Sequence, residues 1–265
     1  MLNTTRGKPS VRQFKVMALA VALCVSLGAA QAQESRGMNE TPSNTGRNTA
    51  SAGLTARQQA ILPIAAFAAA GDIARLNTVL NEGLDAGLTI SDAKEILVQL
   101  YAYAGFPRSL NALSEMMQVV QARKQRGLRD AEGNDPSAPV PKGDALLAAG
   151  TANQTKLSGA PVKGALFEFA PAIDEYLKTH LFGDIFERNT LDWQSRELAT
   201  LGMLSSLAGV EPQLRAHMRI SMNVGLSAAQ LLKVTQVLTD RVGADNGLRA
   251  REALDRQMVA ETDRR

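Results

Sequence analysis

Apolar residues recur at the three- and four-residue spacing of amphipathic helices through most of the chain after residue 53. Ala, Leu, Met, Gln and Glu dominate this part, and the brief Val/Ile clusters show no clear strand alternation. The pattern therefore predicts an all-α fold. The expected helices cover Thr55–Ala70, Asp72–Ala86, Ser91–Tyr103, Pro107–Arg126, Asp144–Thr155, Ala170–His180, Asp192–Ser206, Glu211–Val224, Ala228–Arg241 and Asn246–Val259.

One helix–turn–helix pattern occurs twice along the chain. Gly87 and Gly225 each stand where a helix is expected to end, and glycine favours the left-handed cap at such an end. Thr89 and Ser227 then begin the next helix, each followed three positions later by an acidic or amide residue, as in a capping box. The pattern suggests an internal repeat, although two unrelated helical hairpins would also look alike.

The N-terminus has the order of a secretory signal peptide. Four basic residues and no acidic one precede a short apolar run, Val16–Leu27, and the small-residue sequence Ala30–Ala32 follows. This order predicts cleavage after Ala32 and a periplasmic or secreted protein. The apolar run is short for a membrane span, so an uncleaved anchor is the less favoured alternative.

Removal of residues 1–32 would change the composition. The chain has a net charge of +3, and losing the four basic residues leaves −1, so charge gives no reason to expect binding to nucleic acid or membranes. Cys24 is the one cysteine and would leave with the signal peptide. We expect a disordered linker at 33–52. The predicted organisation continues with a first repeat at 53–126, a connecting segment at 127–165 and a second repeat at 166–265.

Five strings occur in order along the two halves of the chain: Tyr103–Leu113, Leu181–Phe186, Leu191–Thr200, Gly209–His217 and Asn223–Ser227. Together they resemble the carboxymuconolactone decarboxylase family, within the alkylhydroperoxidase D-like superfamily. The resemblance implies tandem helical repeats, homo-oligomeric assembly and, in one branch, decarboxylation of small carboxylated lactones without a cofactor or metal.

The peroxidases of this superfamily carry Cys-x-x-Cys followed by a histidine. In this chain the two cysteine positions fall on Val210 and Gln213, and the histidine falls on His217. A thiolate is the nucleophile and electron carrier in that chemistry. We therefore expect no thiol peroxidase activity from the mature chain, even though the family includes peroxidases.

Two polar residues, whose burial costs free energy, fall on the apolar faces of neighbouring predicted helices. Glu197 projects with Leu201 and Leu204, and His217 lies at the edge of an inward stripe. If the two side chains meet, each offsets the other's burial, and the carboxylate could orient the imidazole for acid/base catalysis. The alternatives are a structural core histidine and a Glu197 ion pair with Arg188 or Arg249.

These residues define the expected function. His217 and Glu197 are the candidate catalytic pair, and Tyr103, Gln213 and Trp193 are candidate substrate-pocket residues. The first repeat has Val79 at the position of His217, so we expect it to act as scaffold. The expected ligand is a small organic acid, and the leading hypothesis is its decarboxylation. A non-catalytic binding or scaffold protein is the alternative.

Overall fold

The computed structural model describes residues 53–137 and 139–262, and this part of the chain is helical with no strand. The predicted signal peptide and linker lie outside the described residues. The first half contains α1 Ala56–Ala70, α2 Ile73–Asp85, α3 Ile90–Gln99 and α4 Tyr101–Gln125. The second half contains α5 Asp144–Ser158, α6 Ala165–Phe169, α7 Pro171–Tyr176, the π-helix η1 Leu177–Ile185, α8 Trp193–Ser205, α9 Glu211–Asn223, α10 Ala228–Arg241 and α11 Ala244–Thr262.

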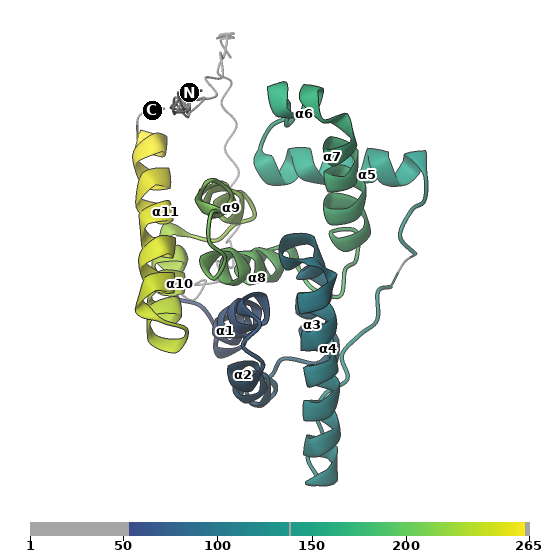
Figure 1. Cartoon of the computed structure of the whole chain (residues 1–265), viewed down its shortest axis with the longest axis vertical. Coiled ribbons are helices and arrows are strands. Elements are labelled where there is room, and N and C mark those ends of the chain that lie inside the picture. The colour runs from purple at the N-terminus through teal and green to yellow at the C-terminus, as the bar shows by residue number, and fades with distance from the viewer. Residues whose placement is uncertain (1–52, 138, 263–265) are drawn as a thin grey trace, which may run out of the picture. The chain divides into compact units, whose positions relative to one another are not determined.

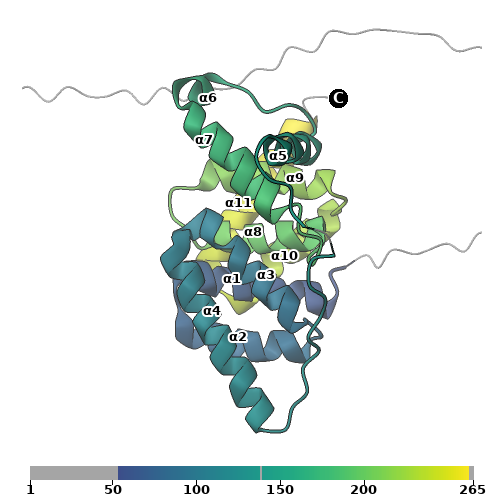
Figure 2. The same cartoon turned by 90° about the vertical axis from the view of Figure 1, so that its right-hand side faces the viewer.

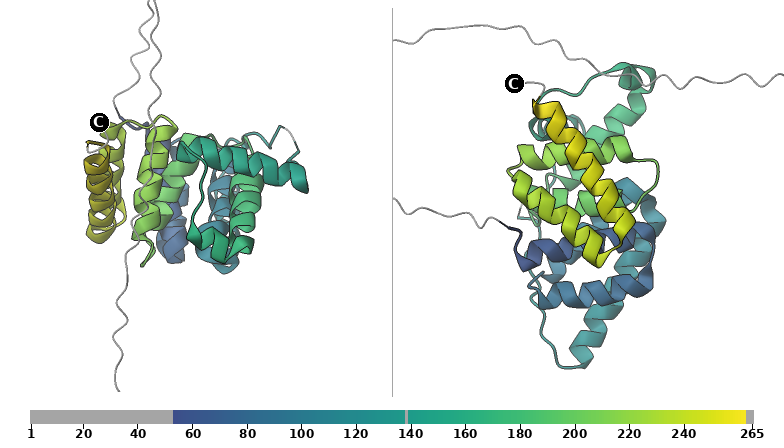
Figure 3. Two further views of the ribbon diagram at one scale, coloured as in Figure 1. Left: turned by 90° about the horizontal axis from the view of Figure 1, so that it is seen from above. Right: turned by 90° about the vertical axis from the view of Figure 1, so that its left-hand side faces the viewer.

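Helices α1 and α8 pack against each other at the centre of the fold (Figure 1). The α10–α11 pair lies on one side of them, with α11 along α9, and α3 and α4 lie on the other side. Figures 2 and 3 show α5 crossing η1 next to α9. None of the helices among residues 53–137 and 139–262 has the length and apolar character needed to cross a membrane.

The repeated turn predicted from the sequence is present in both halves. Gly87 and Gly225 adopt φ values of 91° and 98°, a region that favours glycine. Thr89 and Ser227 cap the following helices, α3 and α10, and each forms a complete capping box with the third residue of its helix. The α2–α3 and α9–α10 pairs are therefore built with the same turn chemistry.

Three local features differ from the sequence prediction. The helix expected to end at Tyr103 ends instead at Gln99, and α4 begins at Tyr101, although non-helical angles at Gly105 (φ 82°, ψ 163°) interrupt α4 where the break was expected. The short helix α6 was not predicted, because its five residues are too few to show a periodic pattern. The helix expected to end at His180 instead continues as η1 to Ile185.

The core consists of two apolar clusters. The larger cluster joins the first-half helices α1 to α4 with α8 to α11. The smaller apolar cluster joins α5, η1 and α9 and consists of Leu157, Leu181, Phe182, Ile185, Phe186 and Ile220. Tyr103 packs against both clusters. Tyr103 of α4 therefore lies where the two clusters meet.

Candidate functional site

Helices α8 and α9 bring the predicted acid/base pair together. Glu197 is fully buried on α8, and His217 on α9 is 8% exposed. The Nδ1 atom of His217 lies 2.7 Å from Oε2 of Glu197. The alternative partners of Glu197 are engaged elsewhere: Arg188 binds Glu95, and Arg249 donates to the carbonyl oxygen of Leu207. The ion-pair alternative predicted from the sequence is therefore wrong.

The contact with Glu197 assigns the tautomer of His217. A carboxylate only accepts hydrogen bonds, so Nδ1 carries a proton, and in the neutral ring Nε2 keeps its lone pair. Among the described residues, no hydrogen-bond partner contacts Nε2, and the side chain remains 10% exposed. The imidazole is therefore oriented on one side and available for proton transfer on the other.

The second oxygen of Glu197 is buried without a hydrogen-bond partner among the described residues, and so is the hydroxyl of Ser221, one turn after His217. Buried polar atoms in native proteins are rarely left unpaired, and exceptions concentrate at functional sites. His217 is thus the one described side chain that directly balances the Glu197 carboxylate.

Tyr103 adds a phenol to this arrangement. Its ring meets the imidazole of His217 edge-on, with centroids 5.8 Å apart. The hydroxyl of Thr200 on α8 donates to the phenol oxygen at 3.2 Å. Burial, reinforced by the negative charge of Glu197, raises the pKa of Tyr103 well above its usual range. The phenol is therefore neutral at physiological pH and keeps a proton to donate.

Of the other two candidate pocket residues, Trp193 is partly buried and Gln213 is exposed. Trp193 precedes Glu197 by one turn of α8, packs against the smaller apolar cluster and donates from Nε1 to the carbonyl oxygen of Phe186 at 3.2 Å. Gln213 is exposed in the first turn of α9. No hydrogen bond among the described residues links Gln213 to Glu197 or His217.

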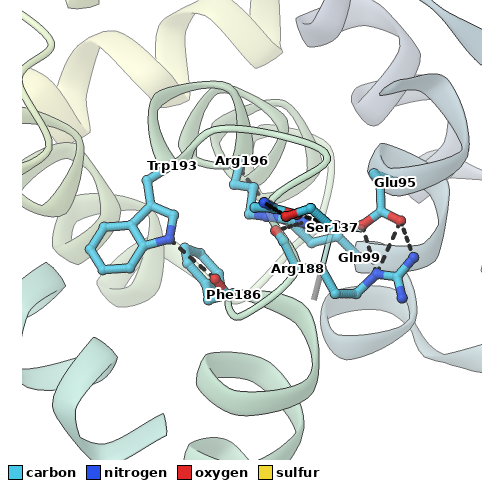
Figure 4. Close-up of polar contacts among 8 residues, drawn as sticks. Glu95, Gln99, Ser137, Phe186, Arg188, Trp193 and Arg196 are labelled. Carbon is cyan, nitrogen blue, oxygen red and sulfur yellow. Dashed lines mark hydrogen bonds and ion pairs between the residues drawn. The ribbon is translucent and has the colours of Figure 1, made fainter. Parts of the chain in front are cut away.

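A buried polar network next to the pair was not predicted (Figure 4). Arg196 is fully buried and donates to Glu95 at 3.0 Å and to Gln99 at 3.3 Å. Gln99 in turn donates to Thr200 at 2.8 Å, which connects the network to Tyr103. Arg196 and Glu95 are far apart in the sequence, and only the packing of α8 near α3 brings them together.

Three hollows of the described surface lie elsewhere. The largest, of about 600 Å³, lies between α2 and α4; one of about 180 Å³ lies between α9 and α11; and one of about 140 Å³ lies beside Arg188. Neither His217 nor Glu197 lines any of these three. Because Glu197 is fully buried and His217 is 8% exposed, a ligand would meet the pair at His217.

The described chain is thus an all-α protein in which an oriented histidine and a buried glutamate connect two neighbouring helices. The family model described as "Carboxymuconolactone decarboxylase family" matches residues 38–116 and 171–256, more than half of the chain. The chain belongs to this family. No curated protein matches the sequence. Tyr103, Glu197 and His217 lie inside the matched segments, whereas α5 and α6 lie between them.

Proposed function

We propose that this protein is an acid/base catalyst that decarboxylates a small carboxylated, lactone-type acid without a cofactor. The observation that carries the proposal is the buried 2.7 Å contact between Glu197 and Nδ1 of His217, which leaves Nε2 available. General acid/base catalysis requires such a group, held by a partner and within reach of the substrate. The family assignment supports the same class of substrate.

In the proposed reaction the bond between the substrate carbon and its carboxylate breaks, and carbon dioxide leaves. The electron pair moves into the lactone system as an enolate, whose oxygen accepts a hydrogen bond from the phenol of Tyr103. Protonated His217 donates its Nε2 proton to the carbon and is reprotonated by water. Glu197 stabilises the positive charge on the ring in the protonated state. The balance is one proton consumed for each carbon dioxide released.

The test is direct measurement of carbon dioxide release from carboxymuconolactone and related lactone acids by the purified mature protein. We expect release above the uncatalysed rate for at least one acid of this class, with no added cofactor. The methyl esters serve as controls, because they cannot lose carbon dioxide. Absence of release from the whole panel would leave the non-catalytic alternative as the better account.

The alternative, a non-catalytic binding or scaffold protein, is supported by exposed apolar side chains. Helices α6 and α7 have no buried residue, and α6 is far too short to be stable alone in water. Phe169 is 89% exposed. On α4, Phe106, Leu110 and Met117 are each more than 60% exposed and recur at helical spacing. Such surfaces are typical of contacts between proteins.

We propose accordingly that the exported protein forms a homo-oligomer through these surfaces. Native mass spectrometry of protein recovered from the periplasm or medium should show a multimer whose protomer begins at Gln33. Replacing Phe169 and Leu110 by aspartate should give monomers, whereas Leu248→Asp, an exposed apolar site on α11, should not. A monomeric unmodified protein would contradict the assembly, and an intact N-terminus would contradict cleavage after Ala32.

A further inference from the structure

Lys156, in the last turn of α5, is held over the face of Trp193. Its ammonium nitrogen lies 4.8 Å from the centre of the indole ring, within the range of a cation–π interaction. The side chain is exposed, and no carboxylate pairs with it among the described residues. The aromatic ring therefore positions this cation while its N–H groups remain free for a ligand.

Helix α5 is anchored firmly enough to place this lysine. The amide of Asn223 donates to the carbonyl oxygen of Leu157 at 2.8 Å. Leu157 is fully buried in the smaller apolar cluster together with Ile220 of α9. At Gly150 the backbones of α5 and η1 touch so closely that any side chain would overlap the carbonyl oxygen of Lys178. The end of α5 is thus attached to α9 and η1.

This anchoring places Lys156 over a residue of α8, the helix that carries Glu197. Trp193 precedes Glu197 by four positions, so the two side chains are neighbours on one face of α8. Ile220 follows His217 by three positions on α9 and packs in the cluster that Trp193 also contacts. One helical turn rises about 5.4 Å, so the backbone of Trp193, whose ring holds the ammonium, lies about one turn along α8 from that of Glu197.

A carboxylated substrate needs a cation at this place. The Glu197 carboxylate repels a second negative charge unless a positive group offsets it. The nearby guanidinium groups of Arg188 and Arg196 are both bound to Glu95. Lys156 has no carboxylate partner among the described residues, and the indole of Trp193 holds its ammonium in place.

We propose that Lys156, positioned by the indole of Trp193, forms the subsite that binds the carboxylate of the substrate. This inference rests on the proposed function. Because α5 lies between the two matched family segments, the subsite is a contribution of this chain's own connecting segment to specificity. Lys156 is a binding residue in this scheme, and proton transfer stays with His217.

The chain contains one tryptophan, so the fluorescence of Trp193 reports binding at this subsite without turnover. The probe is a saturated butyrolactone with the carboxylate on the γ carbon, which is not conjugated with the lactone carbonyl and so cannot form the enolate, and its methyl ester is the matched neutral probe. We expect a saturable change with the acid and none with the ester at equal concentration. Lys156→Met should weaken acid binding about tenfold or more, because a charge-assisted contact is lost.

Lys163→Met, an exposed lysine in the same connecting segment, is the control and should bind like the unmodified protein. Lys156→Arg should retain most of the affinity. For any substrate that is turned over, Lys156→Met should raise KM about tenfold with kcat within about twofold. Equal affinities of the Lys156→Met and unmodified proteins, or no saturable response to the acid, would overturn the subsite. A lysine-dependent response without carbon dioxide release would refute only the proposed reaction.

Discussion

Replacing Glu197 by glutamine should reduce turnover about 10²- to 10⁴-fold, the range by which a positioned acid or base accelerates a reaction. Glutamine can offer its N–H₂ group to Nδ1 of His217, which favours the tautomer that carries the proton on Nε2. The carboxylate charge that stabilises the protonated ring is lost at the same time. His217→Ala removes the proton donor itself and should have an equal or larger effect. The measurement is carbon dioxide release per protein at saturating substrate.

Matched control variants distinguish a loss of catalysis from a loss of folding. Glu211→Gln makes the same chemical change on an exposed residue of α9, and His180→Ala removes the only other histidine, whose side chain is 55% exposed. Both should keep full activity. Far-UV circular dichroism of all four variants should match the unmodified protein, because the helices do not depend on these side chains. Full activity of either Glu197→Gln or His217→Ala would end the mechanistic proposal.

The largest expected effect on stability is that of Glu95→Gln. Glu95 is 4% exposed and is the carboxylate shared by Arg188 and fully buried Arg196. Removing one partner of a buried ion pair leaves an uncompensated charge and costs about 3–5 kcal/mol. For a domain of this size, that cost corresponds to a decrease in Tm of about 6–20 °C. Thermal unfolding at neutral pH measures it.

The surface pair between Glu82 and Arg241 provides the control. Exposed ion pairs contribute about 0–1 kcal/mol, so Glu82→Gln should shift Tm by a few degrees at most. If Glu95→Gln and Glu82→Gln lowered Tm equally, the buried network would contribute no more to stability than an exposed ion pair.

The same carboxylate makes a pH prediction with a defined sign. Burial opposes ionisation of Glu95, but hydrogen bonds from Arg188 and Arg196 outweigh burial and hold the pKa of Glu95 below its usual range. A depressed pKa contributes stability above the unfolded value of about 4.3, and this contribution disappears as pH falls through the folded value. The difference in stability between the unmodified protein and Glu95→Gln should therefore shrink below about pH 4.

Local chemistry made most helices predictable. The two Gly-Leu-Thr/Ser turns combine a glycine cap with a capping box, and Asp92 and Gln230 complete those boxes in the structure as expected. These interactions span only a few residues, so the sequence contains all of their partners. The inward positions of Glu197 and His217 followed from helical periodicity for the same reason.

Side-chain partners distant in sequence were not predictable in the same way. Arg196 stands next to Glu197 in the sequence, yet it reaches Glu95 and Gln99 of α3, and nothing local distinguishes those partners. Lys156 likewise has no distinguishing feature in the sequence, and only the packing of α5 places it over Trp193.

The sequence by itself determined the helical class, the repeated turn and the residue types able to exchange a proton, because hydrogen bonds and periodicity within a helix depend on near neighbours. Tertiary structure alone decided that the imidazole meets Glu197 rather than an arginine, and that a lysine from the connecting segment lies over Trp193. Those outcomes depend on how helices cross, and crossing is set by the packing of many side chains at once.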